Sequence, residues 1–156
     1  MKQKYSSKDT SLNQVAAVYK RFRFPEGAKV LDYGGGKYNT AAEYMKAQGV
    51  TVKVYDPYNR TPEENTEALA MTPDYVVCSN VLNVIAEDEV IDGILATLAS
   101  YLATVLITVY EGNGTGTGAA TTKGYQRNQK AAAYWEAIDR HFSQVSKHNG
   151  VYICHR

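Results

Sequence analysis

The chain contains 156 residues, 44% of them hydrophobic, and carries a formal net charge of +1 at pH 7. This length suits one domain with an apolar core and leaves no room for a separate substrate domain, so we expect residues 1–156 to form a single domain. No apolar run approaches the roughly 20 residues that span a bilayer, so a membrane partner is not expected. The two cysteines, Cys78 and Cys154, lack metal-ligand spacing, so we expect buried thiols and no metal site.

The ends of the chain differ in charge from its middle. The first thirteen residues are polar and lack the apolar core of a signal peptide, which predicts a cytoplasmic protein. Both ends are rich in Lys and Arg, whereas residues 56–92 are mainly acidic. Basic ends favour an anionic partner such as nucleic acid, although a solvated tail and ordinary helix faces explain the same pattern.

Strand and helix patterns alternate along the chain, which predicts an α/β fold with a mostly parallel sheet covered on both faces. The apolar spacing from Val90 to Leu102, and again in the last expected helix, predicts one buried face on each. In chain order we expect a helix over 12–23, a strand over 29–33, a helix over 39–48, strands over 50–55 and 74–79, a helix over 90–102, a strand over 103–110, a helix over 128–142, and strands over 144–147 and 151–155.

Two local signals refine this sheet. Asn149 and Gly150 form a strong two-residue turn signal, which predicts an antiparallel hairpin at the C-terminal end of the sequence. Residues 57–73 are too few for a helix, a full strand and their loops, so the sheet is expected to lack one strand.

A glycine turn follows the first expected strand. Asp32 lies near the end of this strand, and three successive glycines connect the strand to a helix. Because glycine lacks a Cβ and reaches positive φ, such a turn brings the main chain close to a ligand. Asp56 ends the next strand at close to the spacing of about 20 residues at which an acid binds ribose hydroxyls. A nicotinamide site needs a third glycine where Asn39 stands, and no Gly-Lys-Ser/Thr follows for a phosphate-binding P-loop.

This pattern of an Asp-x-Gly-x-Gly turn and a second acid resembles the class I, Rossmann-like S-adenosylmethionine-dependent methyltransferases. The resemblance implies a three-layer Rossmann-like sandwich with S-adenosylmethionine as the cofactor. Asp32 would hold the methionine amino group, Asp56 would bind the ribose diol, and Tyr58 would lie near the adenine. The cofactor-binding residues that the resemblance implies are Asp32, Gly34, Gly35, Gly36, Asp56, Pro57, Tyr58, Ser79, Asn80 and Asn83.

The acceptor side is expected after the strands over 74–79 and 103–110. Asn80, Tyr110 and Glu111 are the candidates for orienting the methyl acceptor, with Glu111 as its proton acceptor. Asn80 and an asparagine three positions later have an equally good structural explanation, the bridging of backbone groups. The Asp/Asn/Ser-Pro-Pro-Tyr/Phe tetrad of enzymes that methylate base amino groups is absent. The glycine-rich loop over 111–124 is expected to be either a lid or disordered.

The segment around Asn83 and the corner over 55–57 also resemble a methyltransferase-like subset associated with phages and DNA phosphorothioation loci. The expected function is methyl transfer to an unidentified acceptor, either a nucleic acid or a small molecule. The alternatives are a non-catalytic S-adenosylmethionine-binding sensor, subunit or decoy, an NAD-binding domain, and a nucleic-acid-binding module. Because the domain has no substrate cap, a second chain in a homo-oligomer is one way of covering its cleft.

Overall fold

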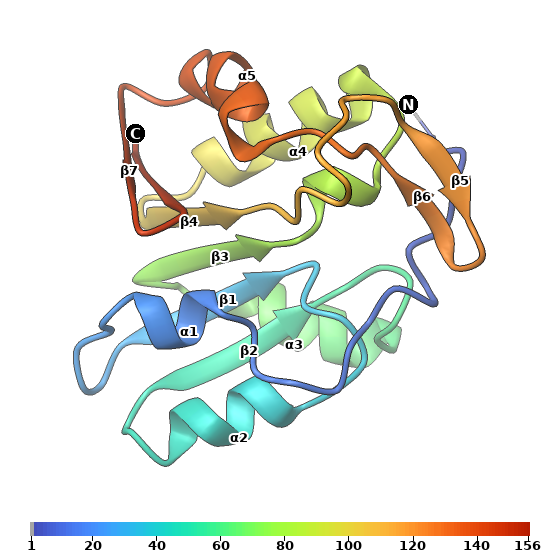
Figure 1. The fold of residues 1–156 in the computed structure, drawn as a ribbon. Helices are drawn as coiled ribbons and strands as arrows, with labels where there is room; N and C mark the ends of the chain where they lie inside the picture. The colour runs from blue at the N-terminus through green and yellow to red at the C-terminus, as the bar shows by residue number, and fades with distance from the viewer. Residues whose placement is uncertain (1) are drawn as a thin grey trace.

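The computed structural model describes residues 2–156, so Met1 of the polar N-terminal stretch lies outside the described residues. A six-stranded sheet in the order β2-β1-β3-β4-β8-β7 forms the middle layer of an α/β sandwich (Figure 1). The strands of this sheet are β1 (Lys29–Tyr33), β2 (Thr51–Tyr55), β3 (Tyr75–Ser79), β4 (Thr104–Thr108), β7 (Gln144–His148) and β8 (Val151–His155).

The strand directions confirm the expected sheet. β1 pairs in parallel with β2 and β3, and β3 pairs in parallel with β4. β8 runs antiparallel to β4, and β7, the first strand of the closing hairpin, pairs antiparallel with β8 at the edge of the sheet. Asn149 and Gly150 connect the two hairpin strands with φ values of 52° and 75°, as a tight turn with two left-handed residues requires.

Helices cover both faces of the sheet. α1 and α2 pack on one face, whereas α3, α4 and α5 pack on the other. The helices are α1 (Val18–Arg21), α2 (Thr40–Lys46), α3 (Pro62–Ala70), α4 (Asp88–Ala99) and α5 (Trp135–Asp139), with 3-10 turns η1 (Leu82–Val84) and η2 (Ala131–Tyr134).

Two separate cores follow from the alternation of side chains along each strand. Val30 and Leu31 are neighbours in β1, but they point to opposite faces of the sheet. Val30 belongs to the core beneath α1 and α2, which includes Met45. Leu31 belongs to the core beneath α3, α4 and α5, which includes Leu95 and Ile138. The parallel strands are therefore buried on both faces, and their carboxyl ends meet at one edge of the sheet.

β2 is an edge strand, and among the described residues only α3 lies between it and β3. The expected absence of one strand is thus confirmed. α3 begins with a strong start signal, since the Thr61 side chain accepts a hydrogen bond from Glu64 N and the Glu64 side chain accepts one from Thr61 N. Pro62 stands in the first helical turn, where its missing N–H is tolerated.

The expected helix over 12–23 is wrong for most of its length. Only Val18–Arg21 is helical, and Leu12 is 59% exposed. The preceding segment is held instead by polar contacts, because Ser11 Oγ accepts a hydrogen bond from Lys37 N and Asn13 Oδ1 accepts one from the Thr40 hydroxyl. We term residues 3–16 the N-terminal strap.

Two further helix predictions extend too far. α4 ends at Ala99, which leaves Leu102 86% exposed and outside the predicted buried face. The helix expected over 128–142 is replaced by η2 and the short α5, because Asn128 has a φ of 58° and Lys130 is extended with a ψ of 151°, so neither can belong to an α-helix. Trp135, which was predicted to lie on the buried face of this helix, is 40% exposed and lies outside the core.

The glycine-rich loop over 111–124, expected to be either a lid or disordered, ends in a short hairpin. β5 (Ala119–Thr121) pairs antiparallel with β6 (Gly124–Gln126) in a separate two-stranded sheet. The Asn128 side chain secures the loop, since its Oδ1 accepts from Asn113 N and its Nδ2 donates to Thr117 O. The Tyr125 ring of β6 then stacks on Tyr5 of the N-terminal strap with 5.0 Å between ring centroids.

Cys78 and Cys154 are buried free thiols, as expected. β4 separates their two strands in the sheet. Within residues 2–156, no helix combines the length and hydrophobicity of a membrane span, and no group of three or more His, Cys, Asp or Glu side chains is arranged to hold a metal ion.

Candidate functional site

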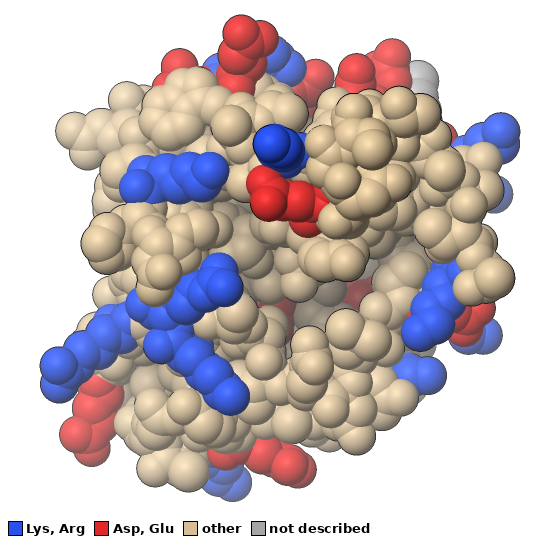
Figure 2. Space-filling view, in the orientation of Figure 1, with Lys and Arg blue, Asp and Glu red and all other residues tan. Residues whose placement is uncertain are grey.

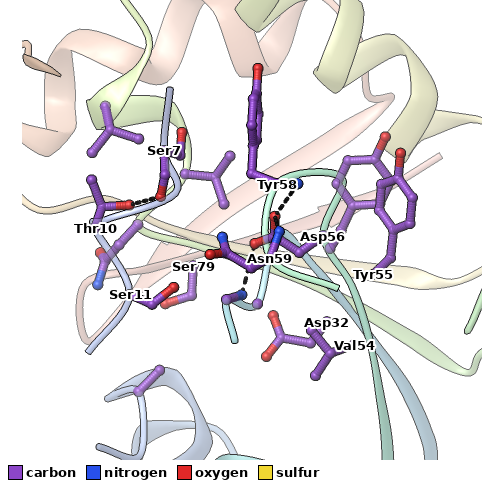
Figure 3. A pocket seen from close by; sticks show the side chains of 18 of the residues that line it. Ser7, Thr10, Ser11, Asp32, Val54, Tyr55, Asp56, Tyr58, Asn59 and Ser79 are labelled. Atoms are coloured by element: carbon purple, nitrogen blue, oxygen red, sulfur yellow. Dashed lines mark hydrogen bonds between the residues drawn. The ribbon is translucent and has the colours of Figure 1, made fainter. Parts of the chain in front are cut away.

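A cavity of about 240 Å³ opens at the carboxyl ends of β1, β2 and β3, where ligands bind in open parallel sheets. Figure 2 shows a hollow on this face of the molecule, with acidic atoms visible inside it. The glycine turn, the residues after β2 and β3, and the N-terminal strap line the cavity. Figure 3 shows Ser7, Thr10 and Ser11 of the strap on one side and Asp32 and Tyr55 on the other.

The N-terminal strap crosses the cavity and touches elements on both sides of it. Gln3 Oε1 accepts a hydrogen bond from the Tyr58 hydroxyl at 3.3 Å, and Ser11 Oγ accepts one from Lys37 N at 3.3 Å. Sequence analysis missed this role, because a polar segment without apolar periodicity carries no signal for its place in the fold. The strap supplies hydroxyl and amide groups to the cavity from Gln3, Ser7, Thr10, Ser11 and Gln14.

Close packing explains the glycines in the turn after β1. Gly34 has a φ of 83°, and a Cβ there would lie 2.6 Å from Val81 Cγ2. A Cβ at Gly35 would lie 2.6 Å from Asp32 Cγ and 2.8 Å from Val54 Cγ1. The turn therefore packs directly on the acid that precedes it, and side chains at these positions would push into the site.

Asp32 is the least satisfied polar group of the site. Its side chain is 5% exposed, and its Oδ1 has no hydrogen-bond partner among residues 2–156. Burial raises the pKa of Asp32 to about 6, while the nearby Tyr19 hydroxyl and Arg60 guanidinium oppose this rise and the charge of Asp56 adds to it. An ionised carboxyl in this position is costly until a positive group or a donor reaches it.

Asp56 lies equally deep, at 5% exposure, but it is well satisfied. Its Oδ2 accepts a hydrogen bond from Gly36 N at 2.9 Å, and its Oδ1 accepts from Tyr58 N at 2.9 Å and Asn59 N at 3.2 Å. Three backbone N–H groups stabilise the negative charge of the carboxylate. The contact with Gly36 also joins the end of β2 to the glycine turn.

Asp32 and Asp56 are the charged residues in the described lining of the cavity, which contains no Lys, Arg or His. A ligand with a pyrophosphate would bring its negative charges toward two buried carboxylates, which is unfavourable in a low-dielectric site. A ligand with a positive group gains from the same arrangement. The cavity therefore favours a cationic ligand over a dinucleotide.

Ser79 and Asn80 bring the end of β3 into the cavity. The Ser79 and Thr108 hydroxyls lie 2.9 Å apart and share a hydrogen bond. Asn80 has a φ of 57°, a conformation unusual for any residue except glycine, and its N–H donates to Thr108 O. Such backbone strain is tolerated best at asparagine and often marks a functional position.

Three of the residues expected at the site do not line the cavity. Asn83 is 2% exposed, and its Oδ1 accepts a hydrogen bond from Tyr110 N at 3.3 Å, which is the alternative structural role considered for it. Tyr110 itself is 60% exposed. Glu111 Oε2 accepts from Ala131 N at 2.7 Å and so supports the start of η2. The expected residues that do meet at the cavity are Asp32, Gly34, Gly35, Gly36, Asp56, Pro57, Tyr58, Ser79 and Asn80.

Comparison with known proteins assigns the chain to a family. A family model described as a methyltransferase domain matches residues 8–149, and the chain belongs to this family. A TehB-like SAM-dependent methyltransferase from Corynebacterium glutamicum is 18% identical, with a TM-score of 0.48 over 84% of this chain and 80% of that chain. No curated protein matches the chain.

Membership of this family makes the protein an enzyme of the methyltransferase class with S-adenosylmethionine as its cofactor. The site fits this cofactor, because Asp32 offers an unpaired buried carboxylate oxygen to a positive group and no basic side chain lines the described cavity. The glycine turn leaves no Cβ where the main chain meets the cavity wall.

Proposed function

We propose that the protein transfers a methyl group from S-adenosylmethionine to a small-molecule acceptor within the cavity beneath the N-terminal strap. The observation that carries this proposal is the buried, unpartnered Oδ1 of Asp32 in a cavity lined by two acids and no base. A cationic cofactor removes the cost of this unpaired charge, whereas an anionic cofactor increases it.

The residues that line the cavity have different roles in this proposal. Bound S-adenosylmethionine supplies a methyl group activated by a positively charged sulfur. Asp32 would accept a hydrogen bond from the methionine amino group, and Asp56 would accept from the ribose hydroxyls with the lone pairs that its backbone donors leave free. Asn80 would orient the acceptor. Methyl transfer depends mainly on alignment of the two reactants, so a site that holds both and excludes water supplies much of the rate.

The acceptor is a small molecule in our proposal because the cavity is covered from within the chain. The N-terminal strap lies across it and contacts the hairpin of β5 and β6 through the Tyr5–Tyr125 stack. No Lys or Arg lines the described cavity, so nothing in it would neutralise the phosphates of a nucleic acid. The resemblance to a phage- and phosphorothioation-associated subset makes DNA the acceptor class against which this proposal is tested.

Product analysis tests the proposal. The protein is incubated with S-adenosylmethionine and either duplex DNA or a panel of small amines, alcohols and thiols, and S-adenosylhomocysteine is measured. We expect product with a small acceptor and none with DNA. We also expect Asp32→Asn to form much less product than the wild type when S-adenosylmethionine is below saturation, because the variant binds the cofactor more weakly. Methylated DNA would contradict the proposed acceptor class. Tight cofactor binding without product from any acceptor would support the alternative of a non-catalytic sensor, subunit or decoy.

A further inference from the structure

Arg60 is a buried cation immediately behind the glycine turn, and sequence analysis gave it no role. It precedes the first turn of α3, and its side chain is only 7% exposed. A buried arginine requires partners for its donors, since an unpaired charge at this depth is costly. The side chain does not line the described cavity, so it acts on the site through other residues.

Most contacts of the guanidinium go to the segment that follows the glycine turn. Nε donates to Gly36 O at 2.8 Å, Nη2 donates to Tyr38 O at 2.8 Å, and Nη1 donates to Asn39 Oδ1 at 2.7 Å. A fourth contact joins Nη1 to Glu64 Oε2 at 3.1 Å. Three acceptors of one short segment are therefore held by one planar group, an arrangement that lysine cannot reproduce.

Gly36 is held on both sides of its Cα. Its N–H donates to Asp56 Oδ2 at 2.9 Å, and its carbonyl oxygen accepts from Arg60 Nε at 2.8 Å. Asp56 and Arg60 are themselves joined, because Arg60 N donates to Asp56 O at 3.1 Å. The loop after β2 thus fixes the end of the glycine turn at two points.

The ion pair with Glu64 does not explain this burial. Glu64 is 48% exposed and stands four residues after Arg60, the spacing of an ordinary surface pair at the start of a helix. Such pairs contribute little to stability and do not require a buried arginine. The three contacts with the glycine-turn segment are the feature that distinguishes Arg60.

We propose that Arg60 is a positioning residue that holds Gly36–Asn39 in the conformation that receives S-adenosylmethionine. The inference rests on the proposed function. Without the guanidinium, the carbonyl groups of the segment lose their donors, and the glycine turn becomes free to leave the wall of the cavity. Because the turn packs on Asp32, movement of the turn also disturbs the acid that binds the cofactor.

The charge of Arg60 gives a second readout. The groups that influence the pKa of the Asp32 carboxyl are Tyr19 on α1, Arg60 itself and Asp56 after β2, while the Cys78 thiol on β3 also faces it and has its own pKa raised by burial and by the charge of Asp32. Arg60 is the cation among these groups, and its charge lowers the pKa of Asp32. Loss of this charge therefore moves the pH at which cofactor binding is lost to a higher value. A purely structural role in α3 would not produce this shift.

The test compares Arg60→Met and Arg60→Lys with two controls, Glu64→Gln and Arg140→Met. Glu64→Gln removes the ion pair but keeps the contacts with the turn, and Arg140 forms a comparable pair with Asp92 far along the chain. We expect Arg60→Met to raise the Kd of S-adenosylmethionine and of S-adenosylhomocysteine by a similar factor of at least tenfold, as for a misplaced binding loop. Both controls should stay within about twofold of the wild type.

The pH profile separates geometry from charge. Arg60→Met should move the acidic loss of binding to higher pH, whereas Arg60→Lys should weaken binding but leave its pH midpoint near that of the wild type. Equal affinities and equal pH midpoints in the wild type and Arg60→Met would overturn the inference. The proposed function would be unaffected by this result, because the wild type would still bind the cofactor.

Hydrogen exchange in the ligand-free protein decides the positional claim without any cofactor. Amides of residues 34–39 should exchange faster in Arg60→Met and Arg60→Lys than in the wild type, and Glu64→Gln should leave them unchanged. Unchanged exchange in both Arg60 variants would overturn the inference. Failure of the wild type to bind S-adenosylmethionine, with faster exchange in the variants, would overturn the proposed function and leave Arg60 as the residue that fixes the turn.

Discussion

Asp32 links the stability of the fold to the chemistry of the site. Its carboxyl is buried, its Oδ1 has no partner among the described residues, and its pKa is raised to about 6. At neutral pH the group is mostly ionised, so the ligand-free protein carries the cost of a buried charge. A cofactor with a positive group recovers this free energy on binding, which is a common balance between stability and function.

Asp32→Asn is therefore expected to stabilise the ligand-free protein. A pKa raised from 3.8 to about 6 means that the folded state binds the proton more tightly than the unfolded state, so stability falls as pH rises between these values. The full shift corresponds to about 3 kcal/mol at pH 7, and roughly half of this remains at pH 5. Urea unfolding of both proteins at the two pH values measures the difference. A variant that is less stable than the wild type at pH 7 would contradict this account.

Cofactor binding should depend on pH through the same group. Above pH 7 the carboxylate is ionised and its own contribution to the affinity should be constant, whereas below about pH 6 the protonated group no longer attracts a cation. We expect the Kd of S-adenosylmethionine to rise toward tenfold per pH unit on the acidic side, because one proton must leave for each cofactor bound. Titrations from pH 5 to 8 check this. If the Kd of the Asp32→Asn variant rose in the same way below pH 6, a group other than Asp32 would be responsible for the acidic loss of binding.

Gly35→Ala tests the packing between the turn and the acid. The added Cβ would lie 2.6 Å from Asp32 Cγ and 2.8 Å from Val54 Cγ1, so at least one of them must move. We expect binding to weaken by about tenfold or more, while Gly93→Ala, at a position with nothing within 4 Å in helix α4, serves as a control that should bind normally. Calorimetry gives both affinities. Normal binding by Gly35→Ala would mean that Asp32 tolerates displacement.

At the scale of whole elements, the strand ends that meet at the site were predictable. Asp32 and Asp56 close neighbouring parallel strands, and the carboxyl ends of such strands lie at one edge of a sheet. Glu111 follows a strand in the same way, but the chain there turns toward η2 and its carboxylate binds Ala131 N. Nothing in the local sequence pattern indicates this long-range hydrogen bond, so the sequence alone could not show that Glu111 lies outside the cavity.

The N-terminal strap and the β5–β6 hairpin are the elements least visible in the sequence. Their residues are polar or small, and their order depends on contacts such as the Tyr5–Tyr125 stack and the hydrogen bond between Lys4 N and Glu87 Oε2. Apolar periodicity detects elements that bury one face, and these segments bury little. The strap lines the cavity from within the same chain, whereas a second chain was only one possible cover for it. Homo-oligomer formation therefore stays a separate prediction.

Tyr125→Ala should loosen the strap from the hairpin without altering the central sheet. An aromatic pair of this kind contributes about 0.5–1.5 kcal/mol, so strap opening should increase by about two- to thirteenfold. Limited proteolysis and hydrogen exchange of residues 3–16 measure this opening, and thermal unfolding shows that the sheet is intact. The exposed Tyr44, which lies on α2 away from the hairpin, provides the control Tyr44→Ala. Equal protection of the strap in both variants would contradict its attachment through Tyr125.

At the scale of the whole molecule, the layers follow from the alternation of strands and helices, whereas helix lengths do not. The mostly parallel sheet, the missing strand and the closing hairpin each rest on a local signal, and each is present. Helix limits depend on tertiary contacts, as at Asn128, whose left-handed backbone and side-chain contacts with the loop prevent the predicted helix from beginning there.

The charge of the whole molecule is close to neutral, so the electrostatic preference of the site comes from local placement rather than net charge. Two acids line the described cavity, whereas Arg60, a cation with a buried side chain, contacts the glycine turn and does not line the cavity. This local separation of charge favours a cationic ligand over a polyanionic one.

Calorimetric titration of the wild type and Asp32→Asn with S-adenosylmethionine and with NAD tests this central claim most directly. We predict that the wild type binds S-adenosylmethionine but not NAD, and that Asp32→Asn remains folded while its affinity for S-adenosylmethionine falls by about 10- to 100-fold, the loss of one charge-assisted hydrogen bond. Binding of NAD by the wild type, or undiminished binding of S-adenosylmethionine by Asp32→Asn, would contradict it.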